Sequence, residues 1–62
     1  MTEQQARAMI AADLTAGGHD PADFDVDRIL SAAFAWDSRR GWMPCADGDG
    51  FWAIAAGARL TP

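Results

Sequence analysis

The chain contains no Lys, Asn or Tyr, and only one Cys and one His. A single cysteine, Cys45, excludes an internal disulfide. Together with His19 it supplies too few ligands for a closed zinc site, which takes four ligands, unless carboxylates complete the set. We therefore expect neither a structural metal nor a cofactor, and the fold must be held together by packing.

The chain also lacks a long apolar run. A membrane-spanning helix needs roughly 20 consecutive apolar residues, and no such stretch is present. The polar residues 2–5 lack the positive charge that opens a signal peptide. A free cysteine without an export signal predicts a protein of the reducing bacterial cytoplasm.

The length of 62 residues predicts a single small domain spanning residues 1–62. A domain of this size buries only about 60% of the surface that its unfolded chain exposes, so its margin of stability is small. Half of the residues are hydrophobic, which argues against disorder, and three Phe and three Trp can build one dense core. The composition fits either a monomer or a homodimer.

The first segment has the pattern of an amphipathic helix. Thr2 and Gln5 have the spacing of a capping box, in which each side chain accepts a hydrogen bond from the other residue's backbone N–H. Gly17-Gly18 fits the C-terminal end of the helix. The apolar residues between these signals recur at helical spacing, at Ala6, Met9, Ile10 and Leu14.

A second helix is predicted from Asp20 to about Trp36. Asp20 can cap it, Pro21 suits the first helical position, and Asp23 favours the positive end of the helix dipole. Asp25 marks a point at which this helix could break. The apolar residues again recur at helical spacing, at Val26, Ile29, Leu30, Ala33 and Phe34.

The last third of the chain has two interpretations. Residues 41–46 and 51–55 are aromatic-rich runs separated by Asp47-Gly48-Asp49-Gly50, which predicts a β-hairpin with Pro44 at a sheet edge. The alternative is a short third helix over residues 51–56, capped by Asp49 and ended by Gly57. The aromatic residues favour the hairpin. We thus predict an α+β fold, two N-terminal helices packed on a short C-terminal β-hairpin, with an all-α fold as the alternative.

Charge is distributed unevenly along the chain. The segment 13–27 contains no Lys or Arg, whereas most arginines follow it. Asp20, Asp23 and Asp27 would share one face of a helix that begins at Asp20. A row of carboxylates at that spacing can imitate backbone phosphates and enter an arginine-lined channel, although first-turn aspartates also simply complement the helix dipole. The predicted partner-binding residues are Asp13, Asp20, Asp23, Asp25 and Asp27.

Catalytic and metal-binding patterns are weak. Asp23, Asp25 and Asp27 have the spacing of the first ligands of a calcium loop, but the glycine and terminal Glu of that loop are missing. Cys45 and His19 would need to meet, with a third group orienting the histidine, to act as nucleophile and base. A chain this short can hardly enclose a substrate pocket, so we expect no enzymatic activity and no catalytic residues.

Arg39, Arg40 and Trp42 form the one basic-aromatic cluster and are secondary interface candidates. Such a cluster can contact phosphate and stack on a base. The net charge of −4 argues against a direct nucleic-acid binder, which normally has a basic face, and a small DNA-binding regulator is our third interpretation. Aromatic residues beside arginine are also typical of an interaction hot spot. Our second interpretation is therefore a structural or accessory interaction module of a phage or mobile element.

The chain is small, acidic and free of lysine, and it has no catalytic set. In these properties it resembles the small anti-CRISPR proteins carried by phages and mobile elements of GC-rich bacteria, a group that shares no residue motif. The resemblance implies a non-enzymatic inhibitor that binds a CRISPR effector, such as a type I surveillance complex, and acts as a DNA mimic on its nucleic-acid-binding surface. The implied partner is a basic nucleic-acid-binding protein, with no membrane and no direct contact with nucleic acid.

Overall fold

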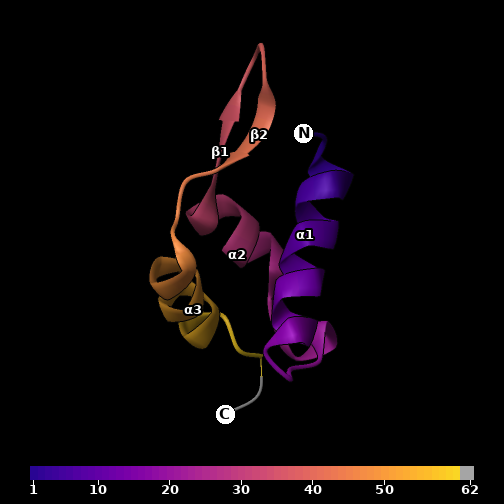
Figure 1. Cartoon of the computed structure of the whole chain (residues 1–62), viewed down its shortest axis with the longest axis vertical. Coiled ribbons are helices and arrows are strands. Elements are labelled where there is room, and N and C mark those ends of the chain that lie inside the picture. The colour runs from indigo at the N-terminus through magenta and orange to yellow at the C-terminus, as the bar shows by residue number, and fades with distance from the viewer. Residues whose placement is uncertain (61–62) are drawn as a thin grey trace.

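A computed structural model describes residues 1–60 as an α+β fold. Figure 1 shows α1 and α3 on either side of the shorter α2, with the hairpin projecting from one end. The molecule measures 37 × 18 × 18 Å along its principal axes. The elements in chain order are α1 (Glu3–Ala16), the 3₁₀ turn η1 (Pro21–Asp23), α2 (Val26–Ala33), β1 (Phe34–Asp37), β2 (Gly41–Pro44) and α3 (Gly48–Gly57).

The predicted first helix is confirmed, including its capping box. The Gln5 backbone N–H donates to the Thr2 hydroxyl over 3.1 Å, and the Thr2 N–H donates to the Gln5 side chain over 2.9 Å. Gly17 caps the other end, and Gly18 has the left-handed φ of +84°. The buried face of α1 consists of Ala6, Ile10 and Leu14.

The predicted second helix is divided in two, and the predicted position of its C-terminal end is wrong. The break near Asp25 is confirmed, because η1 ends at Asp23 and α2 begins at Val26. The helix then ends at Ala33 rather than near Trp36, and residues 34–36 are extended. A strand forms there because residues 34–37 pair with residues 41–44 across a tight turn.

The hairpin exists, but the predicted pairing of residues 41–46 with 51–55 is wrong. β2 pairs antiparallel with β1, placing Phe34 opposite Pro44 and Trp36 opposite Trp42. The Asp37 carboxylate stabilises the turn by accepting hydrogen bonds from the backbone N–H groups of Arg39, at 2.7 Å, and Arg40, at 3.1 Å. Gly41 completes the turn with a φ of +74°, which a side chain would disfavour.

The alternative third helix over residues 51–56 is confirmed, with corrected ends. It begins at Gly48, and its N-cap is Asp47 rather than Asp49. The Asp47 carboxylate accepts a hydrogen bond from the Gly50 backbone N–H at 2.7 Å. The Asp-Gly pairs therefore form the first turn of α3 instead of a hairpin turn.

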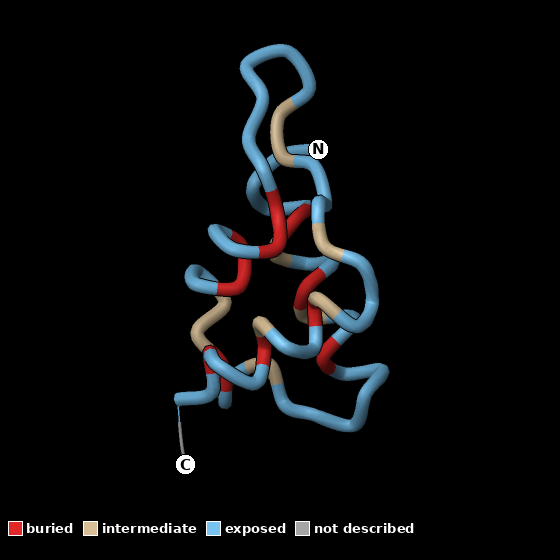
Figure 2. Tube along the Cα trace, turned by 90° about the vertical axis from the view of Figure 1, so that its left-hand side faces the viewer, coloured by how far each residue is buried: buried red, intermediate tan, exposed pale blue. Residues whose placement is uncertain are grey.

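The core lies where α1, α2 and α3 meet, and Figure 2 shows that the hairpin tip stands clear of it. Within residues 1–60 no polar or charged residue is buried. Ile10, Leu14 and Ile29 are the largest fully buried side chains. The complete set of buried residues is Ala6, Ile10, Leu14, Phe24, Ile29, Leu30, Ala33, Phe34, Phe51, Ala55 and Ala58.

Candidate protein-interaction site

The acidic residues of segment 20–27 begin two separate elements rather than one helix. Asp20 caps η1 and accepts a hydrogen bond from the Ala22 N–H at 3.0 Å. Asp25 caps α2 and accepts one from the Arg28 N–H at 3.2 Å. The predicted single helical face for Asp20, Asp23 and Asp27 is therefore wrong, because Phe24 is extended between the two elements and turns into the core.

The backbone of this acidic segment is fastened to the C-terminal part of the chain. Phe24 is buried and forms an antiparallel bridge with Arg59. On either side of it, the Asp25 N–H donates to the Ala58 carbonyl and the Leu60 N–H donates to the Asp23 carbonyl, both at 2.8 Å. The Arg59 guanidinium lies over the Phe24 ring at 5.9 Å from its centroid. The carboxylates of this segment thus project from a fixed backbone.

Asp27 is the one member of the acidic segment with an ion-pair partner among the described residues. Arg7 on α1 contacts both Asp27 and, at 3.4 Å, Glu3. The hydrogen bond that the Arg7 guanidinium donates to the Asp27 carboxylate is the main cause that raises the pKa of Arg7 above its ordinary value. The Asp27 side chain remains 74% exposed, so its carboxylate is still accessible to a partner.

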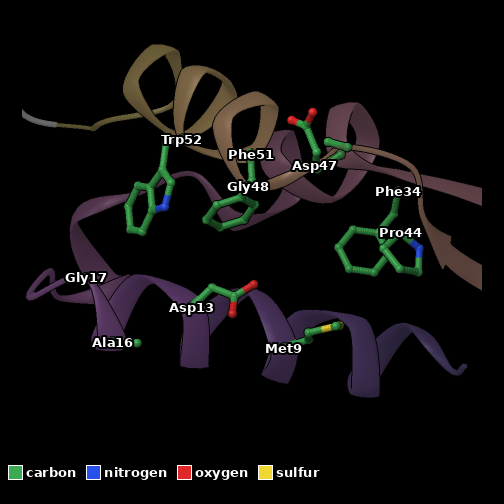
Figure 3. A pocket seen from close by; sticks show the side chains of 12 residues that line it. Met9, Asp13, Ala16, Gly17, Phe34, Pro44, Asp47, Gly48, Phe51 and Trp52 are labelled. Atoms are coloured by element: carbon green, nitrogen blue, oxygen red, sulfur yellow. The ribbon is translucent and has the colours of Figure 1, made fainter.

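Asp13 lies apart from the other predicted acidic residues, on α1, where it lines an open hollow between α1 and α3. The hollow has a volume of about 470 Å³. Phe34 and Phe51 line its apolar interior, and Figure 3 shows Asp13 pointing from α1 toward α3. Asp47 lines the hollow on the α3 side. The Asp47 carboxylate, however, caps α3 and points away from α1 (Figure 3). The hollow is therefore an apolar surface with the Asp13 carboxylate on its α1 wall.

The hairpin carries the other interface candidates. Arg39 and Arg40 are exposed in its turn. Trp42 is half-buried against the core, whereas the Trp36 side chain opposite it is 62% exposed. Sequence reasoning missed Trp36 as a surface residue because it was assigned to a helix. The strand pairing that exposes it depends on contacts distant in sequence.

Phe51 and Trp52 adjoin each other in α3 but have different environments. Phe51 belongs to the core, whereas Trp52 is 38% exposed. The Trp52 ring packs near His19, in the loop that follows α1, with ring centroids 5.5 Å apart. Only Trp52 of this pair is available to a partner.

The possible catalytic and metal-binding groups have structural contacts. The Cys45 thiol donates to the Ala33 carbonyl at 3.3 Å, while His19 packs against the rings of Phe24 and Trp52. These two residues thus lie in different surroundings and do not form a nucleophile–base pair. Among residues 1–60, no cluster of three His, Cys, Asp or Glu side chains has the geometry of a metal site.

No protein-family model matches the sequence, and no curated protein or solved structure matches it significantly. None of the helices in the described part of the chain is both long and apolar enough to cross a bilayer. The surfaces with distinctive chemistry are the acidic segment 20–27, the hollow between α1 and α3, and the hairpin tip.

Proposed function

We propose that the protein is a non-enzymatic inhibitor that binds a basic, nucleic-acid-handling protein in the host cytoplasm. The contact is made by the acidic segment, through Asp20, Asp23, Asp25 and Asp27. The resemblance to anti-CRISPR proteins suggests a CRISPR effector, such as a type I surveillance complex, as the target. The carboxylates would occupy the place of nucleic-acid phosphates.

The observation that carries this proposal is the fixed presentation of the acidic segment. Its backbone is held on both sides of the buried Phe24 by hydrogen bonds to Ala58 and Leu60. A rigid binding surface loses little conformational entropy on association, which favours affinity. Asp20 and Asp25 each use one side-chain oxygen to cap a helix, and an ionised carboxylate has further acceptor sites for arginine.

The test is a pull-down from nuclease-treated host lysate, with the tag placed after Pro62 and elution by a salt gradient. The variant D20N/D23N/D25N/D27N removes the charges but keeps the caps, because Asn caps helices about as well as Asp. The wild type should retain a nucleic-acid-binding protein that elutes at moderate salt, and this variant should not.

The matched control, E3Q/D37N/D47N/D49N, removes as many carboxylates outside the segment. We expect it to retain most of the binding, because its changes leave the acidic segment intact. If the control loses the partner as completely as the first variant, net charge alone drives the interaction and the assignment to residues 20–27 is wrong.

One observation favours the second candidate, an accessory interaction module that binds through an aromatic surface. Trp36 is 62% exposed on the projecting hairpin, and exposed Trp beside Arg is common in interaction hot spots. Binding of this kind should withstand salt and be lost in Trp36→Ala. The same pull-down separates the two candidates, since charge-driven binding weakens as salt rises.

A further inference from the structure

The hollow between α1 and α3 and the projecting hairpin have complementary chemistry. The hollow is concave and apolar, with the Asp13 carboxylate on its α1 wall. The hairpin carries the exposed indole of Trp36 and, in its turn, the exposed side chains of Arg39 and Arg40. An aromatic side chain with neighbouring guanidinium groups is the kind of ligand that an apolar hollow with a flanking carboxylate accepts.

The two surfaces are continuous within one molecule. Phe34 and Pro44, which form the first cross-strand pair of the hairpin, also line the hollow. Trp36 lies two residues beyond Phe34 on β1, so both side chains project from the same face of the ribbon. An apolar surface therefore runs out of the hollow and up the hairpin, and Figure 3 shows the Phe34 and Pro44 rings at the junction.

The lengths of the two surfaces agree. Each strand has four residues, which corresponds to about 13 Å. The α1 wall of the hollow runs from Met9 to Gly17, which corresponds to about 12 Å of helix. The hollow runs from Phe34 and Pro44, at the base of the hairpin, to Gly17 and Trp52, while the strands leave that base in the other direction (Figure 3). A two-fold axis at that base would superimpose each hairpin on the hollow of a second copy.

We propose that the protein forms a two-fold symmetric homodimer in which the hairpin of each copy lies in the hollow of the other. Trp36 packs on Phe34 and Phe51 of the opposite copy, and Arg39 and Arg40, at the far end of the inserted hairpin, pair with Asp13. The contact satisfies the requirement that a two-fold interface be complementary to itself. It also supplies a stabilising device that small domains without disulfides commonly use. This inference is independent of the acidic segment 20–27.

The test is sedimentation equilibrium of the purified full chain by analytical ultracentrifugation, from low to high micromolar concentration. The wild type should change from the mass of one chain to that of two. The variants D13R and R39D/R40D should each weaken association by at least about tenfold, the usual scale for breaking a close charge pair across an interface.

Mixing the two variants distinguishes the proposed contact from other ways to dimerise. In the mixture, the Arg39 and Arg40 hairpin of D13R meets the unaltered hollow of R39D/R40D, so heterodimers should form where neither variant dimerises alone. Far-UV circular dichroism checks the fold, and Asp13→Arg should preserve it because a cation near the C-terminal end of α1 is favourable to the helix dipole.

Each other outcome overturns the inference. A wild type that remains one chain at all concentrations has no such dimer. If D13R alone then fails to retain a basic protein in the pull-down, the hollow binds that protein instead of a second copy. A dimer that neither variant weakens uses a different surface. A dimer weakened by D13R but not by R39D/R40D, without recovery on mixing, places something other than the hairpin in the hollow.

Discussion

Trp52 lies directly across Gly17, so that a Cβ atom added to Gly17 would be 2.7 Å from the Cζ2 atom of the indole. Gly17 ends α1 and has a φ of −82°, which any residue adopts readily. The glycine is therefore required for space rather than for its conformation. The contact joins the end of α1 to the middle of α3 and closes one end of the hollow between them.

We expect Gly17→Ala to destabilise the protein by about 1–3 kcal/mol, the usual cost of overpacking, because Trp52 must move away from its neighbours. Gly57→Ala is the matched control, since a Cβ there meets nothing within 4 Å. It should leave stability unchanged or raise it by up to about 1 kcal/mol. Urea denaturation followed by circular dichroism measures both, and equal effects would show that the Trp52 contact is unimportant.

Gly41→Ala should destabilise the protein more than Gly18→Ala. Both glycines have positive φ, at +74° and +84°, so both variants incur about 1–2 kcal/mol of backbone strain. A Cβ at Gly41 would also lie 2.5 Å from the Met1 carbonyl oxygen, whereas the space around Gly18 is open. Comparison of the two unfolding free energies isolates the contact with Met1, and an equal loss in both variants would exclude it.

Two substitutions of Asp25, the N-cap of α2, should separate its structural role from its charge. Asp25→Ala removes the acceptor for the Arg28 N–H and should cost about 1 kcal/mol, whereas Asp25→Asn should cost much less. Asp23→Ala, whose carboxylate makes no hydrogen bond within residues 1–60, should change stability by less than about 0.5 kcal/mol. A thermal melt of the three variants would contradict this assignment if Asp25→Asn were as unstable as Asp25→Ala.

Arg7→Gln should strengthen the proposed binding to a basic protein. Arg7 contacts Asp27 and Glu3, so its removal frees the Asp27 carboxylate and makes the surface more acidic. The partner should then elute from the immobilised variant at higher salt than from the wild type. Asp27→Asn should shift elution in the opposite direction. A shift to lower salt in both variants would instead show that the intact ion pair is what the partner recognises.

The elements that local signals determine could be predicted from the sequence. The Thr2–Gln5 capping box, the glycine pair and the spacing of Ile10 and Leu14 identify α1 because all of them act within a few residues. Asp25 marks the break before α2 for the same reason. The acidic residues were identified as a surface segment, but their division between η1 and α2 follows from the burial of Phe24, which no local pattern specifies.

The hairpin could not be placed because its strands are ambiguous in isolation. The pattern of residues 34–36 fits a continuation of α2 as well as it fits a strand. The choice between helix and strand depends on their pairing with residues 42–44. For the same reason the sequence predicts the hairpin turn at residues 47–50, where Asp47 in fact caps α3. The hollow lined by Asp13 and Phe51 was beyond sequence reasoning, since it arises only when α1 and α3 are positioned around α2.

The central position of α2 has a consequence for how the protein unfolds. This helix has eight residues, fewer than an isolated helix needs to be stable in water. It packs against α1, α3 and β1, and its residue Ile29 is fully buried among them. Removing any of these neighbours deprives α2 of its support, and loss of α2 separates the others. The amide hydrogens of α2 should therefore exchange with solvent only when the entire chain opens, as a single cooperative unit.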